Sequence, residues 1–124
     1  MIYHVVPLDD WLRVPDRPYA PPTLAQDGFI HCSPDESTAL AVADALFRDA
    51  IGPLMVLLID EEALDTSVRW EPAEPPEPSS TSGEGGSARL FPHVYGRINR
   101  NAVAGMLEVE RDEKGHAVRL SLWS

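Results

Sequence analysis

The feature that most constrains the fold is a stretch of proline, serine and glycine in the middle of the chain, EPAEPPEPSSTSGEGGSA at residues 71–88. Proline crowds its first half, and serine and glycine fill its second, so it can neither bury apolar surface nor pair as a strand. We therefore predict a flexible loop at about residues 72–88. Roughly 36 residues follow it, too few to fold alone. The sequence thus predicts a single domain over residues 1–124, in which the loop is either a tolerated surface insertion or a lid over a site.

The charge balance narrows the classes of partner. Ten Lys and Arg residues oppose twenty Asp and Glu residues, for a formal net charge of −10. Because nucleic-acid affinity rests largely on neutralising phosphates with basic side chains, this balance argues against an RNA or DNA partner. No apolar run reaches the roughly 18–20 residues of a membrane helix, and the first residues lack the pattern of a signal peptide. With a single cysteine, the chain is expected to be cytoplasmic and to have no membrane partner.

Short apolar segments on both sides of the loop predict several strands and one main helix. Strands are expected at IYHVV, GFIHC, LMVLLI, SVRWE and LFPHVYGRI, and a C-terminal hairpin from VAGMLEVE and HAVRLSLW. The main helix is expected over about residues 34–48, with Ser33 as its cap and Glu36 completing a capping box. This order of elements predicts the α+β class, with a mostly antiparallel or mixed sheet and a terminal β-hairpin.

Four histidines and one cysteine are the groups best suited to carry chemistry. His31 and Cys32 are adjacent on an expected strand, so their side chains point to opposite faces, which argues against a nucleophile–base pair. Cys32 is therefore interpreted as a core residue. The histidines show none of the spacings typical of metal sites, and no metal is expected. A metal site assembled from separate strands would need His4, His31 and His93 to converge.

Three of the histidines occur on strands beside aromatic residues. A single strand histidine is most often structural, but aromatic walls with a few hydrogen-bonding groups suit a flat heterocycle attached to a sugar. His31 also precedes a helix start, where backbone N–H groups favour anions. The expected ligand is thus a small molecule or a nucleotide. The residues expected to line its site come from three strands and are His4, Phe29, His31, Ser33, Phe91, His93, Tyr95 and Arg97.

The ordered motifs IYHVV, GFIHCS, LMVLLID, VRWE and FPHVYG resemble those of an uncharacterised bacterial family, domain of unknown function 952 (DUF952). The likeness spans nearly the whole chain apart from the loop. That family is in turn similar to the ADP-ribosyltransferase-like superfamily, and most of all to the RNA 2′-phosphotransferases. Their YHG[ST] and HVHLS motifs resemble Tyr3-His4 and the segment 30–33. The resemblance implies a split, two-sheet α+β fold that holds NAD in a cleft.

The resemblance also implies roles for individual residues. His4 would contact the ribose or pyrophosphate of NAD, and His31 would help to form the pocket for the nicotinamide ribose. The third catalytic position, which orients the reacting ribose, falls on Glu71 or His93. The reaction would be attack at the ribose carbon that bears nicotinamide, helped by charge stabilisation and positioning. NAD would then be a substrate, and ADP-ribose or a similar group would pass to a small molecule or a protein.

The sequence departs from the phosphotransferase pattern at two points. Val5 and Val6 follow His4 where that pattern has glycine, which hinders close backbone approach to a pyrophosphate. The arginines that hold the RNA phosphate have no clear counterpart apart from Arg97. Two other functions therefore stay open: a non-catalytic ligand-binding or partner-interaction module, and a small-molecule biosynthetic enzyme with histidine acid–base chemistry and no NAD. The sequence leaves open whether the chain is an enzyme, and also its oligomeric state.

Overall fold

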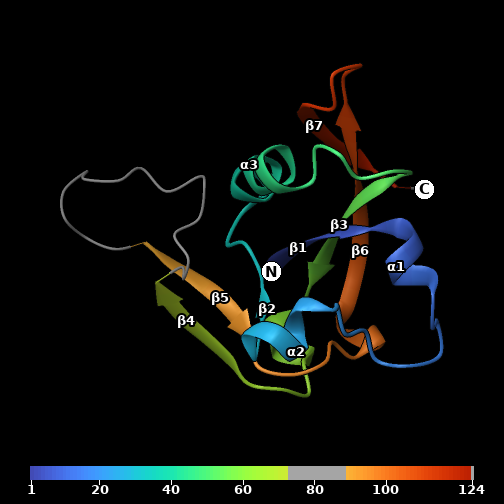
Figure 1. Cartoon of the computed structure of the whole chain (residues 1–124). Coiled ribbons are helices and arrows are strands. Elements are labelled where there is room, and N and C mark those ends of the chain that lie inside the picture. The colour runs from blue at the N-terminus through green and yellow to red at the C-terminus, as the bar shows by residue number, and fades with distance from the viewer. Residues whose placement is uncertain (73–88, 124) are drawn as a thin grey trace.

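The computed structural model describes residues 1–72 and 89–123 and arranges their strands in two antiparallel sheets (Figure 1). The first has the order β1 (Ile2–Pro7), β3 (Leu54–Ile59), β6 (Val103–Arg111) and β7 (Ala117–Leu122). The second has the order β2 (Ile30–His31), β5 (Leu90–Val94) and β4 (Val68–Pro72). The α+β class and the terminal hairpin are confirmed. Apart from Pro72, the predicted loop lies outside the described residues.

Helices connect and cover the strands. They are α1 (Leu8–Leu12), α2 (Thr23–Asp27), α3 (Glu36–Leu46) and two short 3-10 helices, η1 (Glu61–Ala63) and η2 (Arg100–Ala102). Figure 1 shows α3 alongside β7, with the three-stranded sheet at the opposite end of the molecule. Within the described ranges, no helix has the length and apolar character needed to cross a membrane.

The main helix begins later than the sequence predicts. Its N-cap is Asp35, whose side chain accepts a hydrogen bond from the Thr38 N–H at 2.8 Å, so the predicted cap at Ser33 is wrong. The reason is that Ser33 still belongs to the extended chain. Its N–H donates to the Tyr3 carbonyl at 2.6 Å, and its carbonyl accepts from the Tyr3 N–H at 2.9 Å. The segment that leaves β2 therefore pairs with β1 before the helix begins, and it joins the two sheets.

Strand β3 lies between two apolar layers, which explains its continuous run LMVLLI. Its residues Met55, Leu57 and Ile59 pack in one cluster with Ile30 and Val94 of the three-stranded sheet. The intervening Leu54 and Val56 pack in a second cluster with two alanines of α3, Ala39 and Ala43. A strand buried on both faces has no need of alternating polar residues. The larger sheet is thus covered by α3 on one face and by the smaller sheet on the other.

Candidate functional site

The register of the three-stranded sheet places its histidines on one face. His31 of β2 pairs with His93 of β5, which in turn pairs with Arg69 of β4. Residues directly opposite one another in an antiparallel sheet point to the same side. Ile30 and Val94, one position away along the strands, point the other way and are fully buried in the core. The smaller sheet therefore has an apolar face toward the core and a polar, histidine-bearing face away from it.

Four rings meet on this polar face. Phe29 stacks on His93 with a centroid separation of 4.2 Å and an interplanar angle of 24°. The Phe29 ring also lies 4.6 Å from the ring of His31 and 5.3 Å from that of Tyr95. The rings of His31 and His93 meet edge to face at 5.6 Å. We call these four residues, together with Glu71, the Phe29 cluster. The structure thus brings together most of the aromatic and histidine residues that the sequence singled out.

The carboxylate of Glu71 completes the Phe29 cluster. Its Oε1 accepts one hydrogen bond from the Tyr95 hydroxyl at 2.6 Å and another from His93 Nδ1 at 2.9 Å. The hydrogen bond from Tyr95 is the largest cause that lowers the pKa of Glu71, and the bond from His93 is the second. In return, the hydrogen bond to the Glu71 carboxylate raises the pKa of Tyr95. Both candidates for the third catalytic position, Glu71 and His93, therefore belong to the same hydrogen-bonded group.

His93 is the most enclosed member of the cluster, with 2% of its surface exposed. Because a carboxylate only accepts, Nδ1 of His93 carries the hydrogen that faces Glu71, and Nε2 is the other nitrogen of the ring. Within the described part of the chain, this buried Nε2 makes no hydrogen bond. Burying a polar atom without a partner costs free energy, so such atoms are rare and often functional.

The side chain of His31 contacts a residue at the end of α2. Its Nε2 lies 3.0 Å from a carboxylate oxygen of Asp27, the last residue of that helix. Gly28 ends the helix with a φ of +82°, a left-handed conformation that suits glycine, and turns the chain into β2. This turn brings Asp27 and His31 together. No sequence signal pointed to Asp27, because the contact depends on the path of the chain through Gly28.

His4 lies behind the cluster and supports it. Its Nδ1 donates to the main-chain carbonyl of His31 at 2.8 Å, and its ring lies 6.0 Å from that of Tyr19. Burial is the main cause that lowers the pKa of His4 to about 4, so the ring is neutral near pH 7. In residues 1–72 and 89–123, no three His, Cys, Asp or Glu side chains are grouped as metal ligands. Two of the three strand histidines therefore meet, and the third ties β1 to the end of β2.

Other residues singled out by the sequence lie in different surroundings. Cys32 is buried in the core, where burial raises the pKa of its thiol and keeps it protonated, as its core interpretation requires. Ser33 is buried at the junction of the sheets. Phe91 is 1% exposed and lies beneath the guanidinium of Arg89, whose Cζ is 5.3 Å from the ring centroid. These three buried residues help to form the structure that surrounds the site.

Arg97 lies outside the Phe29 cluster. Strand β5 ends at Val94, so the alternation that was expected to carry Arg97 onto the same face stops before it. Arg97 instead lines a separate cavity beside α1. Arg69 takes a place that the sequence did not assign, with its Cζ 4.8 Å from the centroid of the Tyr95 ring. The alternation of SVRWE, which puts Arg69 and Glu71 on one face, was the signal that could have identified it.

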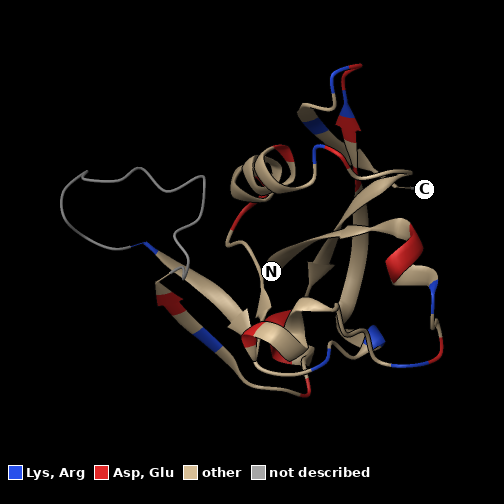
Figure 2. Ribbon diagram, in the orientation of Figure 1, with Lys and Arg blue, Asp and Glu red and all other residues tan. Residues whose placement is uncertain are grey.

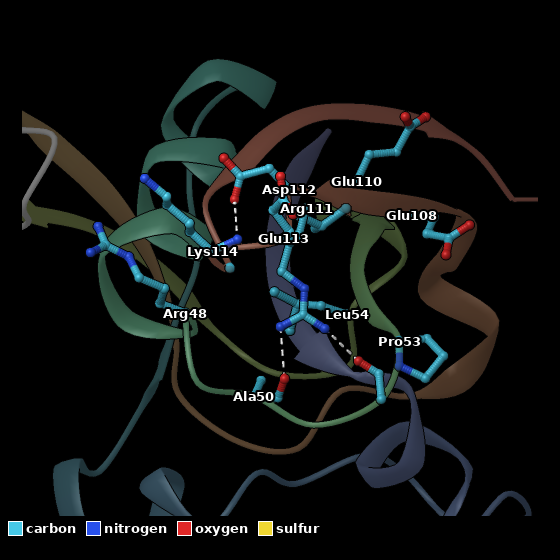
Figure 3. Close-up of a pocket in the computed structure, with 13 residues that line it drawn as sticks. Arg48, Ala50, Pro53, Leu54, Glu108, Glu110, Arg111, Asp112, Glu113 and Lys114 are labelled. Carbon is cyan, nitrogen blue, oxygen red and sulfur yellow. Dashed lines mark hydrogen bonds between the residues drawn. The ribbon is translucent and has the colours of Figure 1, made fainter.

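A cavity of about 810 Å³ lies away from the cluster, between the β6–β7 hairpin and the segment that links α3 to β3 (Figure 3). In Figure 3 the side chain of Arg111 points toward the segment that contains Ala50. Its guanidinium donates to the carbonyls of Ala50 at 2.7 Å and Gly52 at 2.6 Å. Those bonds occupy its guanidinium and attach the linking segment to the hairpin. Acidic side chains, among them Glu108 and Glu110, line the same cavity. We interpret Arg111 as a structural residue and do not place the functional site here.

Together, the fold and the Phe29 cluster define an α+β domain of two antiparallel sheets with a histidine-bearing face on the smaller one. The family model described as "Protein of unknown function (DUF952)" matches residues 5–106, more than half of the chain, and the chain belongs to this family. The family expected from the motifs is therefore confirmed. No curated protein matches the chain.

Two solved structures share the fold. The crystal structure of Protein CC0527 from Caulobacter crescentus is 22% identical, covers 94% of this chain and 92% of its own, and has a TM-score of 0.70. A double mutant of CC0527 is 21% identical, with the same coverage and TM-score. At this level of identity, the likeness establishes a common architecture over nearly the whole chain.

Proposed function

We propose that the protein is an ADP-ribosyltransferase-like transferase whose ligand, NAD or a related nucleotide, binds against the Phe29 cluster. The resemblance of its first two motifs to that superfamily supports the proposal, and the two-sheet architecture is compatible with it. The observation that carries it is the position of Glu71, a carboxylate held in its ionised form beside a wall of rings.

The rings provide a surface for the heterocycle. Phe29, His31 and Tyr95 are each partly exposed, whereas His93 is buried behind Phe29. Flat heterocycles bind against aromatic faces, and a few polar groups then set their orientation. Here the polar groups are His31, held by Asp27, and the Glu71 carboxylate. This combination suits a base or nicotinamide ring with its ribose.

Glu71 provides the electrostatic part of the reaction. In the proposed transfer, the bond between ribose C1′ and the nicotinamide nitrogen breaks, and its electron pair leaves with nicotinamide. The acceptor forms a bond to C1′ and loses its proton. Positive charge develops on the ribose, and a carboxylate fixed in advance stabilises it. Oε1 of Glu71 is used by Tyr95 and His93, while Oε2 makes no hydrogen bond within the described residues, so it can orient a ribose hydroxyl.

Nucleotide binding and transfer are tested separately. Saturating NAD or ADP-ribose should raise the melting temperature of the wild-type protein, because a ligand that binds only the folded state stabilises it. Phe29→Ala should abolish that shift. Glu71→Gln should retain binding and lose nicotinamide release, measured by chromatography. Asp44→Asn is the matched control, since Asp44 pairs with a histidine outside the cluster. A wild-type melting temperature that neither nucleotide changes would rule out the proposal.

A second function, acid–base catalysis on a small molecule without NAD, is favoured by the state of His93. An imidazole whose Nδ1 is bonded to a carboxylate and whose Nε2 makes no hydrogen bond within the described residues has the arrangement of a histidine–carboxylate general base. Because Nε2 is buried, a substrate would reach it only after neighbouring side chains move. Two results together would support this second function. Neither nucleotide would change the melting temperature, and the protein would turn over a screened small molecule in a reaction that His93→Gln abolishes. Nucleotide binding without nicotinamide release would support the non-catalytic module.

A further inference from the structure

A second cavity, of about 210 Å³, lies between α1, the segment that follows it and the residues after β5. Its charged and phenolic lining is Asp10, Arg13, Arg17, Tyr19, Arg97 and Arg100. Figure 2 shows basic segments along the α1–α2 connection and next to η2, two parts of the chain that are far apart in sequence. We call this cavity the arginine pocket.

The arginine pocket has a charge opposite to that of the whole protein. The chain contains ten Lys and Arg residues and has a net charge of −10. Four of its arginines line this one cavity, with a single carboxylate, Asp10. Asp10 is already paired, because its Oδ1 accepts from Arg13 at 2.8 Å. The positive charge of the other three arginines is therefore not balanced by a carboxylate of the lining.

One of these three arginines is fixed by the main chain. Arg100 donates from Nε to the Arg17 carbonyl at 2.7 Å and from Nη2 to the Val14 carbonyl at 2.9 Å. Its guanidinium also lies over the Trp11 ring, 3.9 Å from the centroid. Neutral carbonyls and a ring hold the guanidinium in place without cancelling its charge. Arg100 thus joins the α1–α2 connection to the segment after β5 and shapes the wall of the pocket.

The remaining two, Arg17 and Arg97, are available to a ligand. Both side chains are exposed, and neither guanidinium makes a hydrogen bond or ion pair with another described residue. Tyr19 adds a further donor, because burial is the main cause that raises the pKa of its hydroxyl and keeps it protonated. Planar guanidinium groups match the oxygens of phosphate through paired hydrogen bonds.

We propose that the arginine pocket binds the phosphate group of a small phosphate monoester. Its volume of about 210 Å³ is below the roughly 300–1,000 Å³ of drug-sized sites, which fits a phosphate with a small sugar. A nucleic acid is a poorer fit, because an extended polyanion would meet a protein with a net charge of −10. This site stands apart from the Phe29 cluster and does not rest on the function proposed there.

The proposal is tested with inorganic phosphate and ribose 5-phosphate by calorimetry, at an ionic strength matched with sodium chloride. Both ligands should bind the wild-type protein, and the double variant Arg17→Gln/Arg97→Gln should weaken both at least tenfold. Arg119→Gln removes one positive charge, against two in the double variant, at an exposed arginine on β7, and should leave both affinities unchanged. Phe29→Ala should also leave them unchanged, so failure of the proposed nucleotide site would not be confused with failure of this one.

Three results would overturn the assignment. One is no binding of either ligand to the wild-type protein. Another is equal binding to the double variant, shown to be folded by circular dichroism. The third is a short oligonucleotide that binds more tightly than ribose 5-phosphate and loses its affinity in the double variant, since that would assign the pocket to nucleic acid.

Discussion

The protein contains two histidine–carboxylate pairs that are alike in their bonds and different in their surroundings. His93 Nδ1 lies 2.9 Å from Glu71, and His116 Nδ1 lies 3.2 Å from Asp44. The His93 side chain is 2% exposed and lies beneath Phe29, whereas that of His116 is 43% exposed, where the β6–β7 hairpin meets α3. The two regions show which features separate a candidate functional pair from a structural one.

The two carboxylates, Asp44 and Glu71, also differ in the groups that donate hydrogen bonds to them. For Asp44, the largest cause of a lowered pKa is the backbone N–H of Ala117, and His116 comes second. For Glu71, both leading causes are side chains, Tyr95 and then His93. A carboxylate held by the backbone fastens two elements together. A carboxylate held by two side chains, beside rings that a ligand can reach, is better suited to chemistry.

The largest expected effect comes from removing each histidine. His93→Ala should lower the free energy of unfolding by about 3 kcal/mol, because it leaves a cavity under Phe29. His116→Ala should lower it by about 0.5 kcal/mol or less, as is usual for exposed residues. Urea unfolding of both variants measures the contrast. Equal losses would show that burial does not distinguish the two pairs.

The second prediction concerns pH and the buried histidine behind the cluster. The pKa of His4 is lowered in the folded protein from 6.5 to about 4, so the unfolded chain takes up the proton first. The stability that this group contributes is complete above pH 6.5 and is lost as the pH falls toward 4. By pH 5 the loss should be about 2 kcal/mol.

Unfolding measured between pH 7 and pH 5 tests this prediction. His4→Asn keeps a donor for the His31 carbonyl and removes the titration, so its stability should fall less over the same range. The matched comparison is His116→Asn, which keeps His4 and should therefore keep the loss of stability that His4 causes between pH 7 and pH 5. If His4→Asn showed the full wild-type slope, the loss would have to come from other groups.

The third prediction disturbs the exposed region alone. Gly115 precedes His116 and has a φ of +88°, and an added Cβ would lie 2.6 Å from the Arg48 main-chain oxygen. Gly115→Ala should therefore cost about 1–2 kcal/mol in thermal or urea unfolding. Any ligand response at the Phe29 cluster should persist at temperatures where the variant is folded. Loss of that response would show that the two regions are coupled.

The smallest expected effect is a change in the pKa of a carboxyl, measured by carbon NMR titration. Tyr95→Phe removes the leading cause that lowers the pKa of Glu71, so that pKa should rise. His116→Ala removes only the second cause at Asp44, whose pKa should stay low because the Ala117 N–H remains. A Glu71 pKa unchanged by Tyr95→Phe would contradict the hydrogen bond at 2.6 Å.

Much of the fold was predictable because its signals are local. The run LMVLLI predicted a strand without a polar face, and β3 is indeed buried on both sides. Strand alternation separated His31 from Cys32, and the structure places Cys32 in the core. The helix start was predicted two residues early, because pairing between Ser33 and Tyr3 keeps the chain extended through the predicted cap.

The candidate site was only partly predictable. Alternation along β5 placed Phe91 and His93 on one face, but it could not show that Gly96, with a φ of +154°, follows the end of the strand and that Arg97 lies elsewhere. The sequence could not choose between Glu71 and His93 for the third catalytic position, because their relation depends on how β4 pairs with β5. The register of β4 against β5 puts both in one hydrogen-bonded group.

The sequence by itself determined most of the strands, the main helix, the family and the chemical groups on the strands, since propensity, periodicity and motifs are properties of neighbouring residues. Only the tertiary structure decided which of those groups meet. Antiparallel register aligned His31 with His93, whereas His4 was directed to a main-chain carbonyl behind them. Chain segments far apart in sequence gathered four arginines in one pocket of an acidic protein. Such contacts depend on the packing of the two sheets, which no local pattern specifies.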